Sequence, residues 1–187
     1  MDKIYGVNMS PAVRKVLLVL ETKGVEYERV DVMPFQTPKG YEKIHPLKLI
    51  PGYEDGEVTL GDSAVICSYL EEKYPQTPVY PQGRAERHRA MFLERYSDTR
   101  LFSLLAGGYF AEKFLAPLVL NRPTNEEKIE KTLSLLPAEF SYLENELQGN
   151  FLCGDSLTIA DFSVGSLFLN ASYAGLTSPL LKTHQSL

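Results

Sequence analysis

The fold class of this chain is decided by residues 3–32, which read KIYGVNMSPAVRKVLLVLETKGVEYERVDV. Residues 3–7 and 25–32 are short strand candidates, and residues 11–23 between them place apolar side chains on one helical face. Because a single helix separates the two strands in sequence, we expect them to lie parallel across it. The stretch therefore predicts a β-α-β unit at the start of the chain.

The helix in this unit has local signals at both ends. Ser10 is a residue type that caps helix N-termini, and Pro11 suits the first helical position, where no amide hydrogen is needed. Gly24 supplies a C-terminal stop. These signals predict a helix over residues 11–23.

Residues 53–60, YEDGEVTL, have the pattern of a β-hairpin and come after an irregular stretch that holds Pro34, Pro38 and Gly40. The central Asp55-Gly56 pair fits a type I′ turn, which requires positive φ at both central positions. A further helix is expected to open at residues 62–63 and to end at about residue 74, because a proline follows there.

The second half of the chain has a different pattern. Three prolines and a glycine in residues 75–83 indicate a semi-rigid linker. Long helical patterns follow it over residues 84–114, 125–148 (with Pro137 as a kink site) and 158–174. We therefore expect an α/β domain over residues 1–75, a linker over residues 76–83 and an all-α domain over residues 84–187.

The start of the last helix carries a folding signal. Thr158 to Asp161 form a variant of the capping box, with Asp in place of the usual Glu or Gln at the third helical position. Leu157 and Phe162 occupy the two positions of a hydrophobic staple. We interpret this motif as structural and not as chemistry.

Composition excludes several classes of function. Apolar residues make up 44% of the chain and the net charge is −5, without a basic block that could neutralise a run of phosphates, so we expect no nucleic-acid partner. The longest apolar runs, residues 16–20 and 114–120, are shorter than the ~20 residues that span a bilayer. With no signal peptide at the start, we expect a cytoplasmic protein that is not held in a membrane.

Cysteine and histidine usage points away from disulfides and metals. Cys67 and Cys153 lie in apolar stretches without a C-x-x-C partner, and we interpret both as small buried hydrophobic residues. His45, His88 and His184 are isolated and form no metal-ligand spacing. We expect no metal.

Four motifs resemble, in their order and spacing, those of the soluble glutathione transferases. They are Ser10-Pro11-Ala12-Val13-Arg14, Ile50-Pro51, Gly61-Asp62-Ser63-Ala64-Val65-Ile66, and Gly154-Asp155 followed by Thr158-Ile159-Ala160-Asp161. Within this family, Met9-Ser10 followed by residues 16–21, VLLVLE, is most similar to the serine-type classes, phi-like and theta-like. No cysteine stands where omega-like and beta-like members place theirs, so disulfide exchange is disfavoured. The resemblance implies a thioredoxin-like N-terminal domain followed by an all-helical bundle.

The resemblance also implies a catalytic role for Ser10. A hydroxyl that donates a hydrogen bond to the glutathione sulfur, together with the positive end of the helix dipole, would lower the pKa of the thiol from its ordinary value of about 8.5. Two alternatives remain at this stage: Ser10 only caps its helix, or Tyr5 at the end of the first strand is the donor.

The glutathione-binding residues implied by the resemblance are Gln36, Lys39, Leu49, Ile50, Pro51, Asp62 and Ser63. Ile50-Pro51 matches the family's cis-proline, whose preceding residue pairs through its backbone with the cysteinyl part of glutathione. Asp62 and Ser63 fit the γ-glutamyl end, although a plain helix cap is the alternative. Leu49 stands where a polar side chain often binds the glycine carboxylate, so Lys48, Lys39 or Gln36 would have to substitute.

The electrophile would bind between the domains, near Met9, Phe35 and Tyr109. The resemblance thus implies a homodimeric glutathione transferase that uses glutathione as co-substrate and attacks a small hydrophobic electrophile. Alternatives are a glutathione-dependent isomerase, dehalogenase or peroxidase, and a binding or regulatory module that keeps the fold without turnover.

Overall fold

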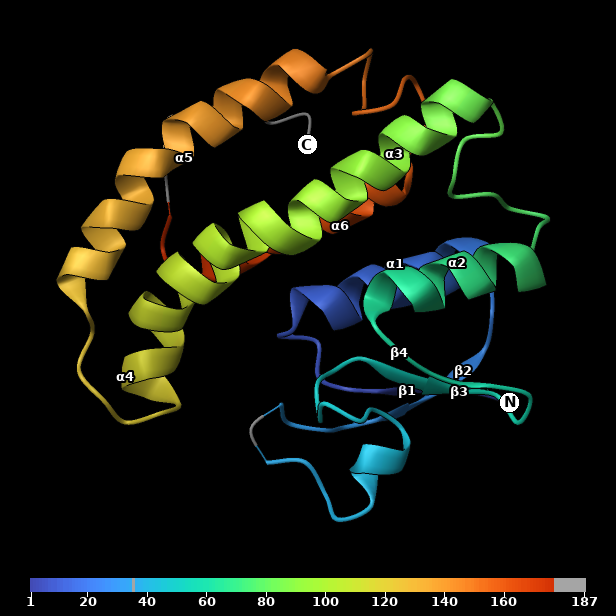
Figure 1. The fold of residues 1–187 in the computed structure, drawn as a ribbon, viewed down its shortest axis with the longest axis horizontal. Coiled ribbons are helices and arrows are strands. Elements are labelled where there is room, and N and C mark those ends of the chain that lie inside the picture. The colour runs from blue at the N-terminus through green and yellow to red at the C-terminus, as the bar shows by residue number, and fades with distance from the viewer. Residues whose placement is uncertain (35, 177–187) are drawn as a thin grey trace. The chain divides into compact units, whose positions relative to one another are not determined.

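The structure, a computed structural model, describes residues 1–34 and 36–176. It divides into two compact units, Met1–Tyr80 and a second that begins at Pro81 (Figure 1). The division falls within the range 76–83 that we expected to be a linker. Each unit has its own core and is described separately below.

The first unit is built on a four-stranded mixed sheet in the order β2-β1-β3-β4. Its strands are β1 (Asp2–Tyr5), β2 (Tyr27–Val30), β3 (Gly52–Glu54) and β4 (Thr59–Gly61). The parallel pair β1 and β2 places Ile4 opposite Arg29, and the antiparallel pair β1 and β3 places Ile4 opposite Tyr53. This is the expected thioredoxin-like arrangement.

Helices α1 (Pro11–Lys23) and α2 (Ser63–Lys73) cover one face of this sheet, and the short η1 (Tyr41–Lys43) lies on the other (Figure 1). The limits predicted for the first helix are confirmed, because Ser10 caps it and Gly24 ends it with a left-handed φ of 66°. The fully buried core of the unit consists of Ile4, Val13, Val16, Val19, Leu20, Tyr53, Ile66, Cys67 and Leu70.

The hairpin is present, but the type I′ turn predicted for Asp55-Gly56 is wrong. Gly56 has a positive φ of 90°, whereas Asp55 does not. The Asp55 side chain instead closes a longer loop, because its Oδ1 accepts hydrogen bonds from the amides of Glu57 (2.8 Å) and Val58 (2.9 Å).

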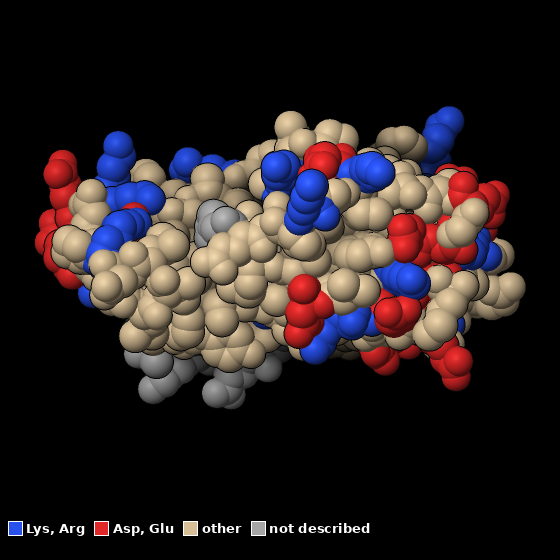
Figure 2. All heavy atoms as spheres, turned by 90° about the horizontal axis from the view of Figure 1, so that it is seen from below, with Lys and Arg blue, Asp and Glu red and all other residues tan. Residues whose placement is uncertain are grey.

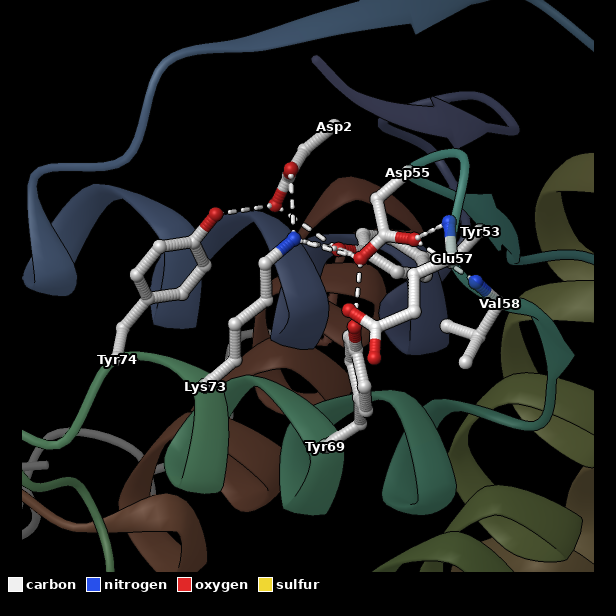
Figure 3. A network of polar contacts seen from close by, with 8 residues as sticks. All are labelled: Asp2, Tyr53, Asp55, Glu57, Val58, Tyr69, Lys73 and Tyr74. Carbon is white, nitrogen blue, oxygen red and sulfur yellow. Dashed lines mark hydrogen bonds and ion pairs between the residues drawn. The ribbon is translucent and has the colours of Figure 1, made fainter.

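Lys73, at the end of α2, holds the Asp55 carboxylate in this position through an ion pair (Figure 3). Its Nζ lies 2.6 Å from Asp55 Oδ2 and 3.1 Å from Asp2 Oδ1. Burial alone would raise the pKa of Asp55, but the hydrogen bonds from Lys73, Tyr69 and the two amides outweigh it and hold the pKa below its ordinary range. The tyrosines that complete the network are Tyr53, Tyr69 and Tyr74.

A second buried ion pair fixes the end of the first unit. Lys23 and Glu71 lie 2.7 Å apart with side chains 0% and 7% exposed. Lys23 Nζ also donates to the carbonyls of Tyr74 and Thr77, both at 2.9 Å. The Glu71 carboxylate accepts hydrogen bonds from the amides of the last two residues of the unit, Val79 (3.1 Å) and Tyr80 (3.3 Å).

The second unit is helical, as expected. Helix α3 (Arg84–Tyr96), the π-type helix η2 (Ser97–Leu115) and α4 (Ala116–Leu118) follow one another without a break. Helices α5 (Glu126–Glu146) and α6 (Ile159–Tyr173) pack against η2, and α6 also packs against α3. In its described part, up to residue 176, the unit contains no strand beyond an isolated bridge between Phe151 and Gly154.

The capping box of α6 is present. Asp161 Oδ2 accepts from the Thr158 amide at 2.8 Å, while its Oδ1 accepts from the Leu152 amide at 2.9 Å and so holds the preceding loop as well. Phe162 is buried, but Leu157, its expected partner in the hydrophobic staple, is 52% exposed.

Glu112 forms the main ionic cluster of the second unit. Its buried carboxylate binds Arg122 through two contacts of 2.8 and 3.0 Å and Lys128 at 3.0 Å. These hydrogen bonds, with that from Arg122 the largest cause, lower the pKa of Glu112 from 4.5 to about 2. The cluster ties η2 to the start of α5.

Candidate functional site

Ser10 stands at the N-terminus of α1 with extended backbone angles, φ −77° and ψ 122°. Its Oγ accepts a hydrogen bond from the amide of Val13 at 3.4 Å, as a helix cap does. This contact uses an oxygen lone pair and leaves the hydroxyl proton available, because a serine hydroxyl both accepts and donates. Capping and donation to a thiolate, which appeared to compete in the sequence, are therefore compatible at Ser10.

The loop that carries Ser10 is held by neighbouring charged residues. Arg14 donates to the Asn8 carbonyl at 2.7 Å, and Arg29 of β2 donates to the Asn8 side chain at 3.0 Å. The Ser10 amide itself donates to the carbonyl of Val7 at 3.0 Å. The hydroxyl is thus fixed close to the positive end of α1.

Tyr5, the alternative donor, has its proton committed elsewhere. Its hydroxyl donates to Glu54 Oε1 at 2.6 Å, and burial together with this bond raises the pKa of Tyr5 to about 12. Side chains alternate between the two faces of a strand, so Tyr5 faces away from the buried Ile4 and packs beside the ring of Tyr41.

The peptide bond between Ile50 and Pro51 is cis, as the sequence resemblance implied. Gly6 allows this segment to approach the first turn of α1: a Cβ on Gly6 would lie 2.5 Å from Val13 Cγ2 and 3.4 Å from Ile50 Cβ. The φ of Gly6, 148°, is also one that other residues rarely adopt. Gly6 therefore brings Ile50 and the helix that begins after Ser10 together.

Ile50 offers an open backbone edge. Within residues 1–34 and 36–176, neither its N–H nor its C=O makes a hydrogen bond. Because unpaired backbone groups require a partner or water, this residue can accept an extended peptide as an added strand.

Asp62 and Ser63 open α2. Asp62 Oδ1 accepts from the amides of Ala64 (3.0 Å) and Val65 (3.2 Å), so the helix cap is formed. Ser63 is only 6% exposed, and its hydroxyl makes no hydrogen bond within the described residues. The cap alone leaves Asp62 Oδ2 and the Ser63 hydroxyl unused.

Two residues beside these segments have left-handed backbones, although neither is a glycine. Lys48 has a φ of 54° and Asp62 a φ of 71°. Such conformations cost about 1–3 kcal/mol and concentrate at functional sites. Among the described residues, Asn121 is the third of this kind, so two of the three border the segments that carry Ile50 and Ser63.

Comparison with known proteins places these features in a family. The patterns of the glutathione S-transferase N-terminal and C-terminal domains match residues 4–78 and 109–187. A relative from Euphorbia esula, "Glutathione S-transferase zeta class", is 31% identical over 169 residues, covering 85% of this chain and 71% of that protein. The chain belongs to the glutathione S-transferase family.

Other comparisons agree with this assignment. "Glutathione S-transferase" from Triticum aestivum is 46% identical over 79 residues, which cover 42% of this chain and 37% of that protein. The match therefore spans less than half the length of the wheat protein. A solved structure of a glutathione S-transferase from Rhodospirillum rubrum F11 has a TM-score of 0.89 at 24% identity, covering 100% of this chain and 84% of that one, and it shows the shared fold.

In this glutathione S-transferase the residues expected at the glycine end of the ligand remain a prediction. Gln36 and Lys39 are both exposed. Leu49 is 51% exposed, and its carbonyl accepts a hydrogen bond from the Tyr41 hydroxyl. Lys48 is exposed next to it.

The expected electrophile pocket of this glutathione S-transferase remains a prediction. Met9 is 38% exposed in the first unit, Phe35 lies outside the described residues, and Tyr109 is buried in η2 of the second unit.

Cys67 is buried as predicted, but Cys153 is only partly buried, and burial raises the pKa of its thiol.

The described residues of this glutathione S-transferase hold no group of three His, Cys, Asp or Glu side chains suited to a metal ion, and His184 lies outside them. None of the helices up to residue 176 combines the length and apolar character needed to cross a bilayer. On the face in Figure 2, Lys and Arg are interspersed with Asp and Glu and form no large area of one sign.

The sequence analysis missed two residues beside the site of this glutathione S-transferase, Tyr41 and His45. Both are buried, at 3% and 7% exposure, in a stretch that we interpreted as irregular. Burial is predicted from a regular spacing of apolar residues, and an irregular stretch has no such spacing. The sequence therefore contains no signal that Tyr41 and His45 are buried.

Proposed function

We propose that this chain is a cytoplasmic, homodimeric glutathione transferase that binds glutathione at Ile50 and Ser63 and stabilises its thiolate for attack on a small hydrophobic electrophile. The observation that carries the proposal is the unpaired backbone of Ile50 before a cis-proline, next to the first turn of α1. The shared family supports it.

The cysteinyl part of glutathione would pair with the N–H and C=O of Ile50 as an added strand. This pairing would bring the sulfur toward the N-terminus of α1, where the Ser10 hydroxyl donates to it and the helix dipole favours negative charge. Both effects favour the thiolate, which is the nucleophile and is a minor species of a free thiol at neutral pH. Tyr5 would take no part, because its proton is bound to Glu54.

The γ-glutamyl end would bind at the start of α2. Since Asp62 already occupies the amides of Ala64 and Val65, the α-carboxylate would be bound by the first amide of the helix and the hydroxyl of Ser63. The free Oδ2 of Asp62 would receive the ammonium group.

The test combines binding and turnover. Calorimetric titration with glutathione should show one site per chain, and a dinitrobenzene electrophile should be conjugated. Ser63→Ala should weaken glutathione binding roughly tenfold, because it removes a hydrogen bond to a carboxylate. Ser68→Ala, in the same helix and without a part in the site, is the matched control.

Each result has a defined meaning. No binding at millimolar glutathione overturns the proposal. Binding without conjugation of any electrophile favours the non-catalytic module. Binding with isomerisation, dehalogenation or peroxide reduction in place of conjugation assigns the thiolate to another reaction of the same site.

A further inference from the structure

Tyr41 is held in a position where its hydroxyl meets the backbone of the candidate site. The side chain is 3% exposed, and the hydroxyl lies 2.8 Å from the carbonyl oxygen of Leu49. A carbonyl only accepts, so Tyr41 is the donor. Burial raises the pKa of Tyr41 to about 12, and the hydroxyl therefore keeps the proton that this bond requires.

The seat of this tyrosine is closely fitted to Gly52 in β3. A Cβ on Gly52 would lie 3.0 Å from the Tyr41 hydroxyl oxygen and 2.5 Å from Ile44 Cγ2. No side chain larger than hydrogen could be accommodated there without displacing the loop. The approach of Tyr41 to Leu49 therefore depends on a glycine directly after the cis-proline.

The geometry of the peptide unit connects this bond to Ile50. Among the described residues the peptide bond between Ile50 and Pro51 is cis, whereas the bond between Leu49 and Ile50 is trans. In a planar trans peptide the C=O and the following N–H point in opposite directions. When Tyr41 holds the Leu49 carbonyl on its own side, the Ile50 N–H must point away from it.

We propose that Tyr41 is a positioning residue for glutathione: through the Leu49 carbonyl it orients the Leu49–Ile50 peptide so that the Ile50 N–H faces the cysteinyl carbonyl of the ligand. The inference rests on the proposed function of this site. It adds a residue that touches no ligand, on the sheet face opposite α1 and α2, to the determinants of glutathione affinity.

The main experiment compares Tyr41→Phe with the wild type. The variant keeps the ring and removes only the hydroxyl, so the peptide loses its fixed orientation. We expect the Kd and KM for glutathione to rise roughly 3- to 10-fold, as for the loss of one hydrogen bond, with kcat nearly unchanged. Tyr5→Phe is the matched control: it removes a hydroxyl from the neighbouring ring, 6.1 Å away, that binds Glu54 and not the loop.

A second readout separates positioning from a general structural role. An analogue of glutathione whose Cys–Gly amide is replaced by an ester has a weaker cysteinyl carbonyl acceptor. The wild type should lose more affinity with this analogue than Tyr41→Phe does, because the bond affected by the ester is already weakened in the variant. Equal losses in both proteins would overturn the inference even if Tyr41→Phe is less stable.

The outcomes distinguish this inference from the function on which it rests. If wild-type protein does not bind glutathione, the proposed function fails. If wild type binds and Tyr41→Phe binds equally well, only the role of Tyr41 fails. A fall in kcat with unchanged KM would also contradict it, since orientation of Ile50 acts on binding.

Discussion

The imidazole of His45 lies over Gly61, and its Cδ2 is 2.6 Å from the position that a Cβ on Gly61 would occupy. The ring is 7% exposed, and its Nδ1 accepts a hydrogen bond from the Leu47 amide at 3.3 Å. His45 belongs to the loop that leads to Ile50, and Gly61 directly precedes Asp62. This contact therefore joins the two segments that we assign to glutathione.

Gly61→Ala should destabilise the protein by about 1–3 kcal/mol, because the new methyl group would overlap the ring. His45→Ala should also destabilise it, by leaving a cavity. Combined, the two changes should cost less than the sum of the single effects, since the methyl group then enters the vacated space. Urea unfolding of all four proteins measures this coupling, and strictly additive free energies would show that the two residues do not compete for one space.

Ser10→Ala should lower the rate of glutathione conjugation at pH 7 roughly 10- to 100-fold, because a hydrogen bond to a charged sulfur is lost. It should also lower stability by about 1 kcal/mol through loss of the helix cap. Ser10→Asp restores a capping side chain but places a negative charge beside the thiolate, so stability should recover while activity does not. Full activity in Ser10→Ala would remove Ser10 from the mechanism.

Lys48→Gly should stabilise the protein by about 0.5–1 kcal/mol. The left-handed φ of 54° is unfavourable for lysine, and the relief exceeds the extra freedom of glycine in the unfolded chain. Lys43→Gly is the control, because Lys43 lies in η1 and has no positive φ. The same change at this position should destabilise the protein. Midpoints of urea unfolding that shift in the same direction for both would contradict the explanation.

Glu112 should make stability fall at acid pH. Its pKa is lowered in the folded state from 4.5 to about 2, so the ionised form stabilises the fold above pH 4.5 and this contribution is lost as the pH falls toward 2. The effect should be about 1–3 kcal/mol, reduced by the exposure of Arg122 and Lys128. Free energies of unfolding at pH 7 and pH 3 should differ less in Glu112→Gln than in the wild type or in the exposed control Glu130→Gln.

The parts of the fold that could be predicted are those encoded by neighbouring residues. Ser10, Pro11 and Gly24 act within one helix, and both ends of α1 lie where they indicate. The second strand is shorter than expected, Tyr27–Val30 and not 25–32, because only these residues lie opposite β1. Strand length depends on the partner, which a local pattern does not contain.

Long-range contacts explain what was missed. The type I′ turn is predicted from the neighbouring pair Asp55-Gly56. The Asp55 carboxylate is instead bound by Lys73 and Tyr69, which are 18 and 14 residues away in the sequence. The resemblance implies roles for Ile50 and Ser63, because both lie in motifs that the family shares. It gave no guide to Tyr41, whose role depends on the particular fit against Gly52.

The hydrogen bonds of Lys23 and Glu71 have a consequence for dissecting the molecule. Together they bind carbonyls and amides as far as Tyr80. A fragment that stops at Pro75 would leave Glu71 without these amides and with a buried charge only partly compensated. To obtain the thioredoxin-like part as an independent module, the gene should be cut after codon 80, so that Glu71 keeps the amides of Val79 and Tyr80.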